Sequence, residues 1–349
     1  MMKRMQYYLR GDVSVLGFAR GMRICVILLF FLIQDFAHAQ GLENPLVKKV
    51  TASFSVPENL LAKRSFAIYN SSFSKEELIQ MQGVFQKTGI DASGYFLTDM
   101  VFANQDAKEK VAAYLAKREV SFLIFIEKEN NNYTLYFTPF NGDNNFVNEG
   151  QNAWKVSHEN LSEALQIIYR TAVNNQPIKN LLINNYPETN FGIELIDGRR
   201  SDFFAIDLKV DNLAIPWFED PEMDSTIKEF FSSSYPNKYS HTSREMSMDE
   251  LQRNGFHYVL SYVHTQGAIA KELLEYEISD NESAITSITY PNGSEKLKTI
   301  ASDKLVYKFY FKHIRSGNVF LGTKWDADVN WLDALRNHIK GFKAELKIP

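Results

Sequence analysis

The feature that most constrains the fold is an order of short apolar runs and amphipathic segments that occurs twice along the chain. In residues 65–185, apolar runs at 65–69 and 121–126 are separated by two stretches, 74–89 and 106–117, whose apolar residues recur every three or four positions. That spacing is typical of one face of a helix, whereas short apolar runs bounded by turn residues are typical of buried strands. This stretch predicts strands that alternate with helices, then a hairpin and a closing helix.

Residues 212–349 repeat this order with different side chains. An apolar run at 213–215 precedes helical patterns, a strong run at 256–263, a strand and turn within 305–321, and a closing amphipathic helix. A period of about 150 residues indicates domain duplication, because solenoid units are only roughly 20–50 residues long. We therefore expect an α/β (α+β) protein of two tandem similar domains, each a mixed sheet with helices, produced by internal duplication.

Capping residues mark several predicted helix ends. Ser74 with Glu77, and Ser247 with Glu250, have the spacing of a capping box, which satisfies free N–H groups at a helix start. Gly89 is placed to end the first helix in the left-handed conformation.

Three segments lie outside the repeated pattern. Residues 40–64 form an N-terminal segment, and residues 186–211 are predicted to form a bridging β-hairpin with Asp197 and Gly198 as its tight turn. Residues 265–283 are an insertion in the second domain, with a helical pattern that the first domain lacks.

The start of the chain has the parts of a secretory signal peptide. Residues 24–33 are apolar, Arg20 and Arg23 precede them, and Ala37 and Ala39 form the small-x-small cleavage pattern. We expect residues 1–39 to be removed after Ala39 and the protein to be periplasmic or secreted. Met22 is an alternative start, because residues 1–21 are long for the basic region of a signal. An uncleaved anchor is less favoured, since a membrane span needs about 20 apolar residues, and no span is expected after cleavage.

Composition excludes several classes of function. Cys25, the single cysteine, lies inside the signal, so the mature chain can form neither a disulfide nor a thiolate metal site. Removing residues 1–39 changes the net charge from −4 to −7, because five basic and two acidic residues are lost. An acidic chain argues against a nucleic-acid partner, which requires a basic face.

Local catalytic motifs are missing from the sequence. It contains no H-E-x-x-H, G-x-S-x-G, P-loop or G-x-G-x-x-G pattern. No catalytic residue, metal ligand or cofactor is therefore predicted, although an enzyme assembled from dispersed residues stays open.

The best candidate site precedes the last helix. Asp326 and Asp328 are flanked by Trp325 and Trp331, and two carboxylates beside an aromatic ring are typical of sugar-processing sites. The favoured alternative is structural, because Asp caps helix N-termini and Trp packs into cores.

Arg199 and Arg200 follow the expected hairpin turn. They are candidates for binding an anionic partner, a lipid headgroup or a polysaccharide, although charged hairpin tips are commonly only solvated. Tyrosines in the predicted strands, including Tyr307 and Tyr310, suggest a glycan-stacking stripe, and the same alternation occurs in half-buried strands that pack on a core.

The order of elements resembles the amino-terminal domain of TolB-like periplasmic proteins. The resemblance is carried by the runs 122–126 and 258–263, and by the hairpin 309–321 that leads into the helix 331–346. It covers each half at the level of topology, and it implies small α/β domains that act in envelope assemblies through protein contacts, without an active site.

These observations favour an exported, non-enzymatic binding or assembly component of the cell envelope. We expect a protein partner in the envelope, with a glycan as a further possibility. The alternative is a secreted hydrolase or glycan-processing enzyme that uses dispersed carboxylates at a cleft between the two domains.

Overall fold

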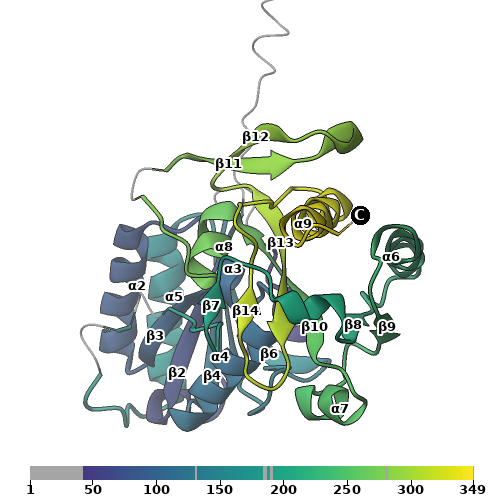
Figure 1. The fold of residues 1–349 in the computed structure, drawn as a ribbon. Helices are drawn as coiled ribbons and strands as arrows, with labels where there is room; N and C mark the ends of the chain where they lie inside the picture. Colours follow the sequence, from purple (N-terminus) through teal and green to yellow (C-terminus); the bar gives the residue numbers. More distant parts are fainter. Residues whose placement is uncertain (1–41, 130–131, 184–186, 189–191, 280–281, 349) are drawn as a thin grey trace, which may run out of the picture. The chain divides into compact units, whose positions relative to one another are not determined.

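The computed structural model describes residues 42–129, 132–183, 187–188, 192–279 and 282–348. The predicted signal peptide, 1–39, lies outside these ranges. The fold class is confirmed, because the described chain is a mixed α/β structure with two six-stranded sheets (Figure 1). Within these ranges, each helix is too short or too polar to cross a membrane.

The first sheet has the strand order β1-β6-β5-β4-β2-β3. Its strands are β1 (Val50–Ser53), β2 (Arg64–Tyr69), β3 (Asp91–Leu97), β4 (Phe122–Glu129), β5 (Asn132–Pro139) and β6 (Gln151–His158). β2 is parallel to β3 and β4, the strands β4-β5-β6 form an antiparallel meander, and β1 joins β6 in parallel. The apolar run of β4 is buried on both faces, as expected for a central strand.

The second sheet has the order β7-β14-β13-β10-β8-β9. Its strands are β7 (Arg200–Ser201), β8 (Leu213–Pro216), β9 (Tyr239–Thr242), β10 (Tyr258–Gln266), β13 (Leu305–His313) and β14 (Val319–Phe320). Every neighbouring pair is parallel or antiparallel in the same way as its counterpart in the first sheet. The two sheets therefore share one topology.

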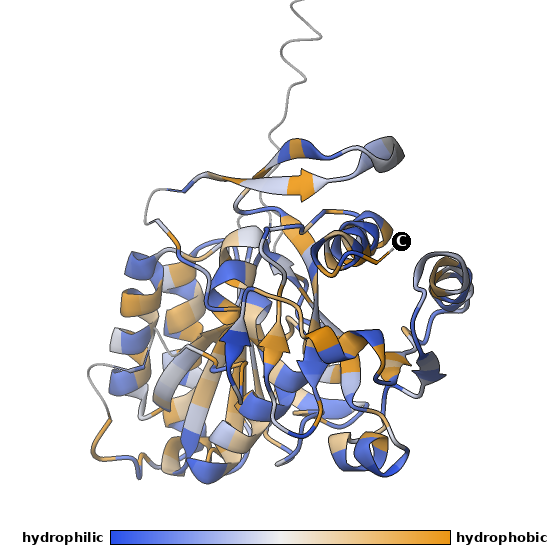
Figure 2. Cartoon of the chain, viewed as in Figure 1, coloured by the Kyte–Doolittle hydropathy of each residue, from blue (hydrophilic) through white to orange (hydrophobic). Residues whose placement is uncertain are grey.

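Helices cover both faces of each sheet. α2 (Lys75–Thr88) and α5 (Leu161–Asn175) pack together on one face of the first sheet, and α6 (Pro221–Ser234) and α9 (Trp331–Glu345) cover the matching face of the second. The other faces carry α3 (Thr98–Val101), α4 (Gln105–Lys117), α7 (Met248–Arg253) and α8 (Gly267–Leu273). Short 3-10 helices lie at Pro45–Lys48, Leu60–Ala62, Ile206–Lys209 and Pro291–Gly293. Apolar residues follow the strands and alternate with polar residues on the covering helices (Figure 2).

A single apolar cluster joins the two halves. Phe66 of β2 and Val111 of α4 belong to the same buried cluster as Val263 of β10 and Ile269 of α8. Polar contacts border it: the Asn104 side chain caps α4 and also donates to the carbonyl oxygen of Tyr262, 3.2 Å away. In the described part of the chain the halves thus meet in a packed core.

The predicted helix ends are confirmed. Both capping boxes, Ser74 with Glu77 and Ser247 with Glu250, form in full. Gly89 ends α2 with a φ of 87°, the left-handed conformation that glycine adopts without a Cβ clash.

The predicted hairpin at 186–211 is wrong in the described part of that segment. Arg200 and Ser201 form β7, which pairs in parallel with β14 rather than with a neighbouring segment. Gly198 instead lies against the β13–β14 turn, where its N–H donates to the carbonyl of Gly317 at 3.2 Å, and an added Cβ would come within 2.5 Å of Ser316 and Asn318. The Asp197 carboxylate bonds Lys110 and Lys312, so the segment is held by tertiary contacts rather than by local pairing.

The second half has an addition that the first half lacks. β11 (Ala284–Thr289) and β12 (Lys296–Ala301) form a separate two-stranded sheet beside α9. The order of elements repeated in the sequence does not include this two-stranded sheet, and β12 was not identified as a strand. The expected insertion at 265–283 contains α8, but its first two residues complete β10.

Candidate functional site

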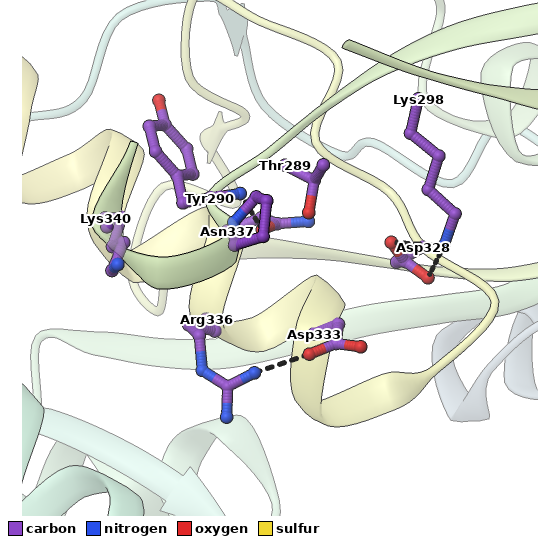
Figure 3. A pocket seen from close by; sticks show the side chains of 10 residues that line it. Thr289, Tyr290, Lys298, Asp328, Asp333, Arg336, Asn337 and Lys340 are labelled. Carbon is purple, nitrogen blue, oxygen red and sulfur yellow. Dashed lines mark hydrogen bonds and ion pairs between the residues drawn. The ribbon is translucent and has the colours of Figure 1, made fainter. Parts of the chain in front are cut away.

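A pocket of about 550 Å³ lies between the β11–β12 hairpin and the first turns of α9 (Figure 3). The hairpin, the segment before α9 and one face of α9 each contribute lining residues. They are Thr289, Tyr290, Pro291, Gly293, Lys298, Asp328, Asp333, Arg336, Asn337 and Lys340.

Helix α9 presents its lining residues because its start is fixed and their spacing is helical. The Asn330 side chain accepts hydrogen bonds from the N–H groups of Leu332 (2.9 Å) and Asp333 (3.1 Å) and so caps the helix. Positions 333, 336, 337 and 340 then fall on one face. Asn337 is buried, and its side-chain oxygen accepts from the N–H of Tyr290 at 3.1 Å, which ties the hairpin to the helix.

The pocket carries more positive than negative side chains. Lys298 pairs with Asp328 at 2.7 Å, and Arg336 pairs with Asp333. Lys340 has no carboxylate within ion-pair distance among the described residues, and its Nζ lies 5.9 Å from the centre of the Tyr290 ring. Three cations against two carboxylates leave an excess of positive charge.

A buried ionic cluster joins β13, the segment before α9 and α9 itself. Lys308 is fully buried, and its Nζ is 2.7 Å from Oδ1 of Asp326 and donates to the carbonyls of Leu321 (2.8 Å) and Phe309 (3.0 Å). The other oxygen of Asp326 is 3.0 Å from Nδ1 of the buried His338.

The charges of this cluster follow from burial and pairing. Burial would raise the pKa of Asp326, but Lys308 and His338 outweigh it, so the pKa is lowered and the carboxylate is ionised. Burial lowers the pKa of His338, and Asp326 offsets this only in part, so the imidazole is neutral at pH 7. The cluster is a Lys–Asp ion pair with a neutral histidine.

Asp326 and Asp328 do not form a pair. Asp326, only 5% exposed, is enclosed with Lys308 and His338, whereas Asp328 lines the pocket and pairs with Lys298. The capping interpretation is also wrong, because Asn330 caps α9; Asp328 instead accepts from the N–H of Asn330 at 3.2 Å.

The two tryptophans lie away from the pocket lining. Trp325 packs edge-on against Tyr276 with ring centres 4.9 Å apart, and its carbonyl accepts from the N–H of Ile288 at 2.8 Å. Trp331 contacts Phe218 with ring centres 5.1 Å apart, at the edge of the core of the second sheet.

The two arginines have different roles. Arg199 is exposed, with its backbone N–H bonded to Asn318. Arg200 donates to the carbonyl of Leu274 at 2.8 Å, pairs with Asp202 at 2.9 Å, and stacks on Tyr276. Arg200 is therefore occupied by intramolecular contacts. The proposed tyrosine stripe is likewise broken, because Tyr310 is buried.

The sequence patterns did not identify the cations of the pocket. The spacing of Arg336 and Lys340, one turn apart on the predicted closing helix, could have indicated that both lie on one helix face. Lys298 had no such signal, because it comes from the strand β12, which was not predicted. The buried ionic cluster could have been suspected from Lys308, because a lysine within an apolar strand needs a buried partner.

A second cavity of about 410 Å³ belongs entirely to the first half, where Arg64 and Asp91 are among its lining residues. Within the described ranges, no group of three or more His, Cys, Asp or Glu side chains could hold a metal ion.

Two buried carboxyls lie where β3 and β4 end. Asp99 accepts from the N–H of Leu42 at 3.0 Å, and Glu127 accepts from the side chain of Asn70 at 3.1 Å. Burial raises the pKa of Glu127 to about 7. The backbone oxygen of Asp99 accepts from Thr265, so this group adjoins the second half.

No protein-family model matches the chain, and no curated protein is detectably similar to it in sequence.

Proposed function

We propose that the protein is an exported, non-enzymatic binding or assembly component of the cell envelope that acts through protein contacts. One feature that occurs in both halves supports this proposal. Both sheets end in a short edge strand, β1 or β7, and each of these strands is followed within two residues by an exposed phenylalanine.

The observation that carries the proposal is the exposure of Phe54 and Phe203. Phe54 is 96% exposed beside β1, and Phe203 is 66% exposed beside β7. Burying a phenylalanine is worth about 1.5–3 kcal/mol, and an edge strand offers unpaired backbone N–H and C=O groups to an added strand. A protein partner with an extended segment fits both features.

Duplication and export are parts of the same proposal. The shared topology of the sheets supports an origin by internal duplication, and it fits the resemblance of each half to TolB-like periplasmic domains. The hydrolase alternative gains no support from Asp326, because that carboxylate is enclosed by Lys308 and His338.

The test is purification of a C-terminally tagged chain, expressed at its native level, from gently solubilised envelopes. We expect a stoichiometric protein partner and an intact mass that begins at Gln40. Phe54→Ser should remove the partner. Ile79→Ser is the matched control, because Ile79 is 62% exposed on α2, away from the strand edges.

Three results would contradict the proposal or its parts. Recovery of the chain as a free monomer would exclude a stable assembly, and an intact mass that includes residues 1–39 would exclude signal cleavage. Equal partner recovery with Phe54→Ser, Phe203→Ser and Ile79→Ser would show that the edge strands are not the contact.

A further inference from the structure

We propose that the pocket between the β11–β12 hairpin and α9 binds an anionic small molecule that carries hydroxyl groups, namely an acidic sugar or a sugar phosphate. This inference goes beyond the proposed function, because it concerns a small ligand and a surface distant in sequence from Phe54 and Phe203.

Charge is the first argument. Lys298, Arg336 and Lys340 face Asp328 and Asp333, so this region is positive on a chain whose net charge is −4. Lys340 is the cation without a carboxylate partner in the described part of the pocket. An anionic group placed there would complete the pairing that Lys340 lacks.

Arginine geometry is the second argument. A guanidinium group has five N–H donors in a planar fork that matches carboxylate and phosphate oxygens. In the described structure, Arg336 bonds Asp333 through one terminal nitrogen. Arg336 and Lys340 are four residues apart on α9, so they can contact one anionic group together.

Neighbouring acceptors indicate a ligand with hydroxyl groups. Asp328 and Asp333 line the same pocket as Thr289 and Tyr290 (Figure 3). Hydroxyl groups can donate to carboxylates, and an aromatic ring can pack against the apolar face of a sugar. The volume of about 550 Å³ is in the range of small-molecule sites.

The walls of the pocket are held before any ligand arrives. Ile288 of β11 donates its N–H to the carbonyl of Trp325 at 2.8 Å, and the Ser287 hydroxyl donates to the carbonyl of Ala327. Together with the bond from Tyr290 to Asn337, these contacts fix the hairpin against α9. A preformed site loses less free energy of ordering on binding.

The test is isothermal titration calorimetry of the full mature chain at low salt, with glucuronate and glucose 6-phosphate as probes. Glucose is the neutral control, and inorganic phosphate is the control without hydroxyl-bearing carbon. We expect one site per chain for glucuronate or glucose 6-phosphate and at least tenfold weaker binding of glucose. The acidic probe that binds more tightly shows whether the pocket prefers a carboxylate or a phosphate as the anionic group.

Variants locate the site. Lys340→Gln and Arg336→Gln should each weaken binding at least tenfold, whereas Lys343→Gln, on the same helix but outside the lining, should not. Thermal unfolding of each variant checks that it is folded. The proposal fails if neither acidic probe binds, if glucose binds equally, if phosphate alone binds equally, or if Lys340→Gln binds like Lys343→Gln. Partner recovery through Phe54 is independent of all these outcomes.

Discussion

Replacing Lys308 by methionine should destabilise the protein by about 3–5 kcal/mol at pH 7, the usual cost of removing one partner of a buried ion pair. Lys308 is fully buried with its Nζ 2.7 Å from the Asp326 carboxylate. At an effective dielectric constant of about 20, unit charges at that distance attract by about 6 kcal/mol. Methionine keeps an apolar side chain where the stem of Lys308 lies. It has no ammonium group to desolvate, and this saving offsets part of the lost attraction.

In Lys308→Met, the ionisation of Asp326 determines how the loss of stability depends on pH. In the wild type the pKa of Asp326 is lowered, so its contribution to stability is present above the ordinary carboxyl pKa of about 4 and is lost as the pH falls. Without Lys308, burial raises that pKa. The carboxyl then takes up a proton on acidification, and the cost of Lys308→Met should shrink towards pH 4.

Urea unfolding followed by tryptophan fluorescence and circular dichroism measures the free energy of unfolding, provided that the two transitions coincide. In a double-mutant cycle, Lys308→Met and Asp326→Asn should show a coupling of about 2 kcal/mol or more. Lys324→Met is the control, because the Lys324–Glu295 pair at 2.8 Å is about half exposed and should contribute less than about 1 kcal/mol. Additive single variants that cost under about 1 kcal/mol each would refute the reasoning.

Three further predictions concern other sites. Glu127→Gln should stabilise the protein at pH 8 and have little effect at pH 4, because burial raises the Glu127 pKa to about 7 and its ionisation costs stability as the pH rises; equal effects at both pH values in urea unfolding would contradict this. Burial lowers the His264 pKa to about 4, so between pH 6.5 and 4 only the unfolded state takes up this proton, and the wild type loses on the order of 3 kcal/mol of stability. His264→Gln should remove this loss; a variant whose stability depends on pH as the wild type's does would contradict the prediction. Gly198→Ala should lower the free energy of unfolding by about 1–3 kcal/mol, because the added methyl group clashes with Ser316 and Asn318. Gly192→Ala is the control, because nothing lies near an added Cβ there; similar melting temperatures for the two variants would show that Gly198 is not tightly packed.

Elements with a local signal could be predicted from the sequence. The capping boxes at Ser74 and Ser247 use contacts within four residues, so their pattern is visible in the chain itself. The edge strands could not be found in this way. β7 has two residues and pairs with β14 more than a hundred residues later, so its pairing depends on tertiary contacts and not on periodicity.

The candidate sites show the same division. Asp326 and Asp328 were identified because they are adjacent to two tryptophans, yet their different environments depend on Lys308 and Lys298, which come from separate strands. The pocket joins a hairpin to a helix face about 40 residues away, and no spacing rule links such segments.

The apolar cluster shared by the two halves also has a consequence for how the chain reaches its native state. Phe66 and Val111 share one buried apolar cluster with Val263 and Ile269, which are synthesised about 150–200 residues later. Until those residues arrive, the first half presents an uncovered apolar face, the kind of surface on which partly folded chains aggregate. A fragment that ends at residue 185 should therefore be poorly soluble. The two halves complete their folding together, although each repeats the same topology.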